Sequence, residues 1–139
     1  MSLRPDRMQK NNIMQEDKSM KILKSNVENI ANEKKLVYQL TKGTSISFKD
    51  MTDEELDQSW SVDAFIIYEE DDKKLISILS SQTSPGGLVS KVVLGGQSKP
   101  FIDSFEEILE IMEDEPFSIH VQKLTSGKNR TFYKATLDF

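Results

Sequence analysis

Residues 99–113 read KPFIDSFEEILEIME, and residues 117–139 read FSIHVQKLTSGKNRTFYKATLDF. In the first stretch the apolar residues recur at the spacing of an amphipathic helix, and Pro100 suits its first turn. In the second stretch apolar and polar residues alternate on either side of a Thr-Ser-Gly-Lys-Asn turn at residues 125–129, which is typical of a β-hairpin. The chain is therefore expected to end in a helix, closed by Pro116, and a hairpin.

These two stretches carry opposite charge. Residues 101–116 contain seven carboxylates and no Lys or Arg. Residues 117–139 contain a single carboxylate, Asp138, and four cations, which are Lys123, Lys128, Arg130 and Lys134. Cations can follow the phosphates of a single-stranded nucleic acid while nearby aromatic rings stack on its bases. The hairpin is therefore a candidate nucleic-acid-binding element, and its four cations are the candidate phosphate contacts.

The aromatic residues of the hairpin differ in their expected environment. Alternation in the second arm assigns Tyr133 to the apolar face, which leaves Phe132 on the outer face beside Lys134. An exposed Phe among cations can stack on a base, so Phe132 is the first candidate stacking residue. Trp60, Tyr68 and Tyr133 are further candidates, although a lone Trp at the start of a strand is more often a core residue.

The middle of the chain predicts several strands. Residues 60–68 are rich in aromatic and β-branched side chains, and residues 74–81 form the returning strand after an acidic turn. Ser-Pro-Gly-Gly at residues 84–87 signals another turn, and residues 88–94 follow as a further strand candidate. Residues 50–58 are an acidic connector with room for one helical turn.

The N-terminal part predicts a tail, a helix and a short strand. Residues 1–25 are polar, with six cations against three carboxylates, and are expected to be a flexible tail. Residues 26–41 show an imperfect helical period, with Asn26 as a candidate N-cap and Gly43 after the helix. Residues 44–48 are a short strand candidate. The folded domain is therefore expected to span residues 26–139.

This order of elements lacks a regular alternation of strand and helix, which disfavours a doubly wound parallel sheet. It favours a mainly β protein with helices, in the α+β class. Several short strands with one helix before the final pair match a small, partly open β-barrel of the oligonucleotide-binding (OB) type. One further helix is expected at the N-terminal side of that barrel.

The composition and motifs argue against an enzyme. The chain has no cysteine, and its only histidine, His120, is expected on a solvent-facing strand without metal-ligand partners. The glycine pairs at residues 86–87 and 95–96 lack the spacing of a phosphate-binding loop, and no nucleophile–base set is visible. We therefore expect no catalytic activity, no cofactor and no metal.

No apolar run approaches the roughly 20 residues of a membrane span, and residues 1–20 lack the apolar centre of a secretory signal. Together with the absence of cysteine, these features lead us to expect a cytoplasmic protein without membrane contact.

In the order of these features, residues 28–139 resemble the small single-stranded DNA-binding proteins of phages and conjugative plasmids of Gram-positive bacteria. The matching segments are EKKLVYQL at 33–40, VDAFIIY at 62–68, GGLV at 86–89, FEEIL at 105–109, and KLTSGKNRTFY at 123–133 with a final LDF at 137–139. The terminal helix and hairpin are the distinctive part. The resemblance implies an OB fold and a protein that coats single strands during replication or transfer.

Two functions are compatible with these patterns. The first is sequence-tolerant binding of single-stranded DNA, or of RNA, that weakens with salt. The second is an acidic protein-interaction module, supported by residues 50–72, which contain ten carboxylates and no cation. Self-association through the basic tail is also expected, although the tail could instead contact phosphates directly or be an inert leader.

Overall fold

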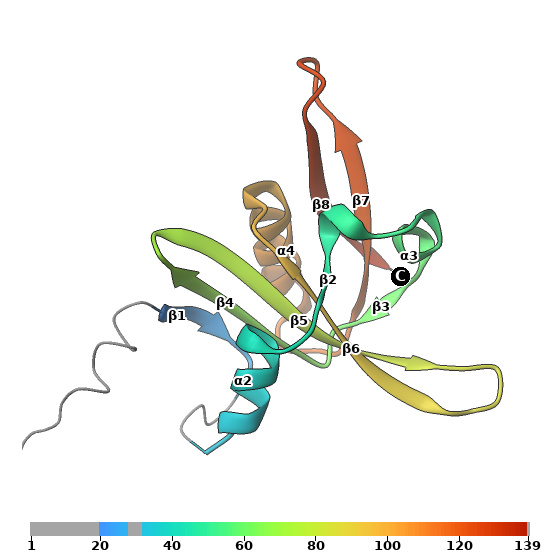
Figure 1. Cartoon of the computed structure of the whole chain (residues 1–139). Coiled ribbons are helices and arrows are strands. Elements are labelled where there is room, and N and C mark those ends of the chain that lie inside the picture. The colour runs from blue at the N-terminus through green and yellow to red at the C-terminus, as the bar shows by residue number, and fades with distance from the viewer. Residues whose placement is uncertain (1–19, 28–31, 139) are drawn as a thin grey trace, which may run out of the picture.

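The protein is described here from a computed structural model, in which residues 20–27 and 32–138 are described. These residues form eight strands, three α-helices and a short 3-10 helix (Figure 1). In chain order the elements are β1 (Met20–Ser25), α2 (Lys34–Lys42), β2 (Ile46–Ser47), η2 (Phe48–Asp50), α3 (Asp53–Asp57), β3 (Trp60–Ser61), β4 (Ala64–Glu70), β5 (Lys73–Thr83), β6 (Val89–Gly96), α4 (Lys99–Met112), β7 (Ser118–Thr125) and β8 (Thr131–Asp138).

The strands form two sheets. The larger sheet has the order β1-β4-β5-β6-β2, in which only the short β2–β6 pair is parallel, and the smaller antiparallel sheet has the order β3-β7-β8. The predicted strand at 60–68 is thus two strands, with a bend at Val62 and Asp63. At this bend the Val62 N–H donates to the Phe117 carbonyl at 3.0 Å, and the Asp63 N–H donates to the Leu79 carbonyl at 2.9 Å. One bent segment therefore joins both sheets.

Both faces of the larger sheet are buried. One face contributes Phe65, Ile67 and Ile76 to a core shared with α4 and the smaller sheet. The opposite face packs Ile66 and Tyr68 against α2, whose Leu40 is buried there. Burial on both faces explains why β4 is continuously apolar at residues 64–68 instead of alternating.

Helix α4 supplies the centre of the larger core. Its N-cap is Ser98, whose hydroxyl accepts from the Phe101 N–H, and Pro100 lies in the first turn. Four apolar side chains of α4 are buried, each worth about 1.5–3 kcal/mol relative to exposure: Phe101, Ile102, Phe105 and Ile108. The helix ends after Met112 because Glu113 adopts the left-handed conformation, three residues before Pro116.

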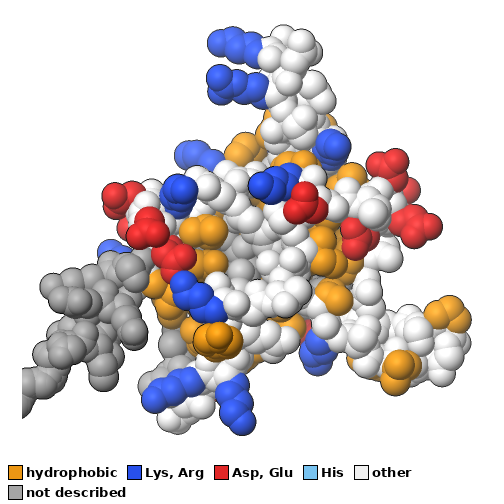
Figure 2. Space-filling view, in the orientation of Figure 1, with side chains coloured by type: hydrophobic (Ala, Val, Ile, Leu, Met, Phe, Trp, Pro, Cys, Tyr) orange, Lys and Arg blue, Asp and Glu red, His pale blue; other side chains and the backbone are white. Residues whose placement is uncertain are grey.

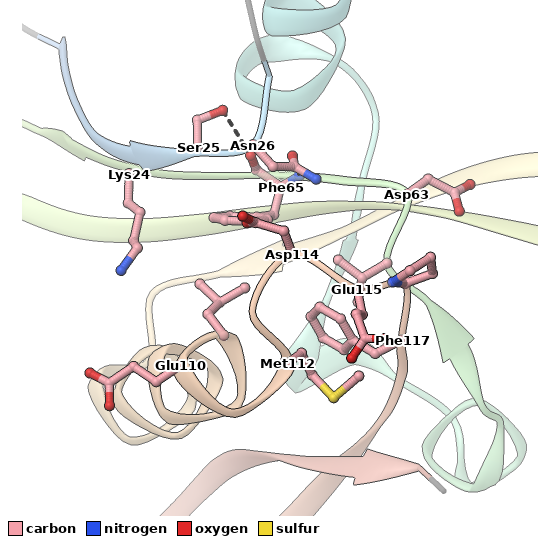
Figure 3. Close-up of a pocket in the computed structure, with 13 residues that line it drawn as sticks. Lys24, Ser25, Asn26, Asp63, Phe65, Glu110, Met112, Asp114, Glu115 and Phe117 are labelled. Carbon is pink, nitrogen blue, oxygen red and sulfur yellow. Dashed lines mark hydrogen bonds between the residues drawn. The ribbon is translucent and has the colours of Figure 1, made fainter.

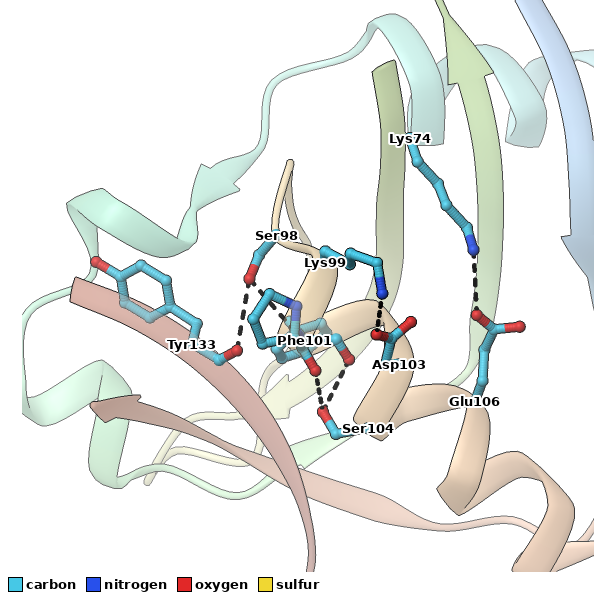
Figure 4. A network of polar contacts seen from close by, with 9 residues as sticks. Lys74, Ser98, Lys99, Phe101, Asp103, Ser104, Glu106 and Tyr133 are labelled. Atoms are coloured by element: carbon cyan, nitrogen blue, oxygen red, sulfur yellow. Dashed lines mark hydrogen bonds and ion pairs between the residues drawn. The ribbon is translucent and has the colours of Figure 1, made fainter. Parts of the chain in front are cut away.

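The two sheets do not close into a barrel, because β6 and β8 belong to different sheets and α4 lies along the edge of β8. The Ala135 N–H donates to the Ser104 hydroxyl at 2.8 Å. The Ser98 hydroxyl lies 3.4 Å from the Tyr133 carbonyl, as Figure 4 shows. Serine side chains thus bond backbone groups that a neighbouring strand would otherwise pair. The fold is a mixed α+β structure, as the sequence predicted.

The N-terminal part differs from its prediction. Residues 20–25, assigned to a flexible tail, form the edge strand β1 on β4. The helix predicted from Asn26 begins at Lys34 in the described residues, and the Asn26 side chain instead accepts from the Phe65 N–H at 2.8 Å. The alternation of Met20 and Ile22 is too short, among lysines, to signal a strand. Residues 1–19 lie outside the described part, so tail-mediated self-association stays a prediction.

The remaining elements follow the sequence closely. The predicted returning strand is β5, the predicted turn in the acidic connector is α3, and the terminal helix and hairpin are α4, β7 and β8. The sharp β4–β5 turn places Asp71 and Asp72 at φ 52° and 64°, a region that Asp tolerates better than most residues.

Ser104→Ala removes the acceptor of the buried Ala135 N–H. An unsatisfied buried donor costs about 1–3 kcal/mol, offset by roughly 0.5 kcal/mol of improved helix propensity, so we expect a lower free energy of unfolding. Denaturant unfolding measures this change. Ser90→Ala, on an exposed part of β6, is the control and should change stability by less than about 0.5 kcal/mol. Equal stability of the two variants would contradict the role given to Ser104.

Candidate nucleic-acid interface

The β7–β8 hairpin extends from the body of the molecule and ends in the loop at the top of Figure 1. Its register pairs residues from Ser118 opposite Asp138 to Thr125 opposite Thr131 without interruption. At the tip the Ser126 N–H donates to the Arg130 carbonyl at 2.8 Å, and the Asn129 N–H donates to the Ser126 carbonyl at 3.0 Å. The loop that carries Lys128 and Arg130 is therefore held by its own backbone.

The four cations of the hairpin are exposed: Lys123, Lys128, Arg130 and Lys134. None of them forms an ion pair with the residues that the structure describes, whereas Lys42, Lys74, Lys91 and Lys99 each contact a carboxylate. Figure 2 shows basic side chains at the end of the hairpin without acidic side chains around them on this face. These charges are therefore available to an anionic ligand.

The hairpin cations do not share one face. Lys134 lies opposite Gln122 and Lys123 lies opposite Tyr133, so the two lysines point to opposite sides of the ribbon. Lys128 and Arg130 occupy the tip between them. A ligand that contacts all four predicted phosphate-binding residues must therefore pass around the hairpin instead of lying flat on one side.

The aromatic residues divide as the alternation predicted. Phe132 is half-buried on the outer face, paired with Leu124 and on the same side as Lys134. Tyr133 packs against the core, with its ring centroid 6.1 Å from that of Phe48. Phe132 is thus the aromatic side chain that the structure places beside the hairpin cations on the outer face.

Trp60 and Tyr68, the other candidate stacking residues, are 1% and 5% exposed. They are core residues in this fold, and neither ring offers a surface to a base. The Trp60 Nε1–H donates to the Glu55 carbonyl at 2.9 Å, which anchors α3, and burial raises the pKa of Tyr68. Their burial results from packing against elements distant in the sequence, and the aromatic content of residues 60–68 could not predict it.

The base of the hairpin contains a polar group that sequence reasoning missed. His120 Nε2 lies 3.3 Å from Asp138 Oδ1, and the Ser59 hydroxyl donates to the other oxygen of the same carboxylate. The hydrogen bond from Ser59, followed by the one from His120, holds the pKa of Asp138 below its ordinary value. The sequence predicted a solvent-facing His120 without metal-ligand partners, and no local pattern connects His120 to residues 59 and 138.

Helix α3 lies beside β7 and places carboxylates next to the basic hairpin. Thr52 and Glu55 form a capping box, with the Glu55 N–H 3.2 Å from the Thr52 hydroxyl and the Thr52 N–H 2.9 Å from the Glu55 carboxylate. Between α3 and β7 lies an open hollow of about 570 Å³. Its lining comprises Asp53, Leu56, Asp57, His120, Val121, Gln122, Lys123 and Thr136.

A larger hollow of about 950 Å³ opens between the end of β1 and the C-terminal end of α4 (Figure 3). Apolar side chains such as Leu109, Met112 and Phe117 line part of it. Four carboxylates and one lysine also line it: Asp63, Glu110, Asp114, Glu115 and Lys24. This second hollow has the opposite charge character to the hairpin.

The ten carboxylates of residues 50–72 do not form one surface. Four of them belong to α3, beside β7, whereas Glu69 to Asp72 lie at the distant end of the β4–β5 hairpin. Figure 2 shows acidic side chains on two opposite sides of this face accordingly. Part of this charge is already paired, since Glu70 contacts Lys42 and Asp63 lies 3.2 Å from Lys91.

Among the described residues, no group of three or more His, Asp or Glu side chains is arranged to hold a metal ion. The longest described helix, α4, has 14 residues, and no described helix combines the length and apolar content that a membrane crossing requires. Comparison with family models, curated proteins and solved structures gave no match. Function must therefore be inferred from the site itself.

Ser59→Ala should raise the pKa of Asp138 toward its ordinary value, because the largest cause of its depression is removed. A carboxyl group with a depressed pKa stabilises the fold at pH values above its ordinary pKa. This contribution is lost as the pH falls through the pKa of the folded state. NMR titration of the Asp138 carboxyl carbon measures the midpoint in both proteins. An unchanged midpoint would show that Ser59 does not bond this carboxylate in solution.

Proposed function

We propose that this protein binds single-stranded DNA with little sequence preference and coats single strands, as its resemblance to phage and plasmid proteins implied. The observation that carries the proposal is the projecting β7–β8 hairpin, which presents four exposed, unpaired cations within the described structure and Phe132 beside them. Electrostatic contact with phosphates and stacking on bases are the two interactions that sequence-tolerant single-strand binding requires.

The order of elements supports the same proposal. The run β4-β5-β6-α4-β7-β8, with Trp60 and Ser61 pairing to β7, is compatible with a partly open OB-type arrangement of five principal strands and one helix. In folds of this type the loop between the last two strands contributes to oligonucleotide binding, and here that loop carries Lys128 and Arg130. We therefore propose an open OB-like variant, with α4 covering the edge of β8.

A path for the strand follows from the position of the charges. Phe132 and Lys134 lie two residues apart on one face of β8, which corresponds to a spacing of roughly 6.8 Å along the strand. One base stacked on Phe132 leaves the next phosphate within reach of Lys134. The tip cations then contact phosphates on one side of this point, and Lys123 contacts the strand where it rounds the hairpin edge.

A second candidate function is docking of a basic protein partner, supported by the larger hollow with its apolar lining. Glu110, Asp114 and Glu115 have no ion-pair partner among the described residues. This function would use the opposite end of α4 from the hairpin contact. It predicts binding that the hairpin variants below do not affect.

The logarithm of the affinity for single-stranded DNA should fall linearly with log salt, with a slope of about −0.7 for each neutralised phosphate. Lys128→Gln with Arg130→Gln removes two contacts, so the slope should become less steep by about 1.4. Lys34→Gln with Lys35→Gln on α2 is the charge-matched control and should leave the slope unchanged. A flat salt series, or tighter binding to duplex, would contradict the proposal.

Phe132→Ala should weaken single-strand binding by about 1–3 kcal/mol through loss of one stacked base. Because Phe132 is only half-buried, its loss should cost the fold less than the ~3–5 kcal/mol of a buried Phe. Leu124→Ala, the cross-strand partner, is the control, since it loses packing without losing a stacking ring. Fluorescence anisotropy and thermal unfolding separate the two effects. Equal losses of affinity in both variants would exclude stacking by Phe132.

A further inference from the structure

Resting on the proposed function, we propose that the hollow between α3 and β7 binds one base of the DNA strand. We further infer that its carboxylates favour a base with an exocyclic amino group, so that cytosine binds better than thymine at this position. The otherwise sequence-tolerant contact would then contain one selective position. This base site is separate from the stacking contact of Phe132 and from the phosphate contacts of the hairpin cations.

The hollow combines the features of a base site. Leu56 is half-buried and gives it an apolar surface, against which a planar ring can lie. Val121 also lines the hollow, but its side chain is buried in the core. Lys123 lies at the same hollow, exposed and without an ion pair in the described structure, where it can neutralise the phosphate of the bound nucleotide. Gln122 and Thr136 add neutral hydrogen-bonding groups.

The acidic side of the hollow has a defined arrangement. Asp53 and Asp57 are four residues apart on α3 and therefore lie on the same side of that helix, together with Leu56. Neither carboxylate has an ion-pair partner among the described residues. Glu54 does not line the hollow, and the Glu55 side chain is used in the capping box. Two acceptors thus face the hollow without an internal donor.

The helix that carries these carboxylates is fixed at both ends. The capping box holds its first turn, and the bond from Trp60 Nε1–H to the Glu55 carbonyl ties its last turn to the core. The acceptors are therefore preorganised, which reduces the entropy lost when a ligand binds. On β7 the facing residues include His120, whose Nε2 is already engaged by Asp138.

Carboxylates beside a phosphate-binding hairpin weaken binding by repulsion unless they meet hydrogen-bond donors on the ligand. The N4 amino group of cytosine donates to Asp or Glu carboxylates, whereas the corresponding O4 of thymine is an acceptor that no carboxylate can satisfy. Cytosine and thymine are both pyrimidines of similar size, so apolar contact in the hollow cannot separate them strongly. The difference between their edges therefore determines the preference.

The test compares oligo(dC) and oligo(dT) of equal length by fluorescence anisotropy at neutral pH. The full-length protein should bind oligo(dC) about tenfold more tightly, because the carboxylate–amino contact forms with cytosine and not with thymine. Asp57→Asn should bring the ratio close to one, because the amide both removes repulsion toward thymine and can donate to its O4. Glu54→Gln removes the same charge outside the hollow and should preserve the ratio while strengthening both complexes equally.

Circular dichroism confirms that the variants are folded, and Asp57→Ala provides a second variant that removes the acceptor without adding a donor. Equal affinity of the unaltered protein for both oligonucleotides, or a ratio that Asp57→Asn and Asp57→Ala leave unchanged, overturns the base site while single-strand binding stands. Absence of binding to either oligonucleotide instead overturns the proposed function.

Discussion

The bend at Val62 and Asp63 is the constraint on which the rest of the structure depends. Two successive backbone N–H groups donate in different directions there, one to the loop before β7 and the other to β5. The segment that begins at Trp60 therefore belongs to both sheets. Because of this shared segment, the terminal hairpin is fixed relative to the larger sheet, although β6 and β8 are not paired. The buried Trp60 at the start of the bend also determines where α3 lies.

Charge is distributed so that the core elements and the hairpin have different electrostatic environments. On α4, Asp103 lies 2.7 Å from the Lys99 amino group, and Glu106 lies 3.4 Å from that of Lys74 (Figure 4). Such exposed pairs contribute little to stability. These two ion pairs do reduce the negative electrostatic potential of α4 near the larger sheet. The hairpin cations lack such partners within the described structure, so their field is directed at solvent and at anionic ligands.

The parts of this fold that sequence predicted are those with local signals. The apolar stripe predicted α4, and the alternation in β8 correctly placed Phe132 and Tyr133 on opposite faces. Both signals depend on the spacing of neighbouring residues, which the sequence contains. The errors concern distant pairs. Strand β1 exists through its pairing with β4, and Trp60 and Tyr68 are buried by elements far away in the chain. Similarly, the position of Lys123 and Lys134 on opposite sides of the hairpin follows from the strand register, which the sequence does not give. The hollow beside α3 exists because α3 packs next to β7.

The hydrogen bonds from Ser98 and Ser104 have a consequence for how the hairpin opens. Along the side of β8 that faces α4, these two side-chain contacts, at Tyr133 and Ala135, replace a continuous backbone ladder, and β3 supports β7 only at Ser118 and Ile119. The base of the hairpin is thus tied to the global unfolding of the domain, whereas its outer part can separate by local fraying alone. Amide exchange should accordingly be slow around Ile119 and Ala135 and become faster step by step toward Gly127. The outer part of the hairpin, which is proposed to contact DNA, is thereby the part whose strands separate most easily, and it could adjust to a flexible nucleic acid while the core stays intact.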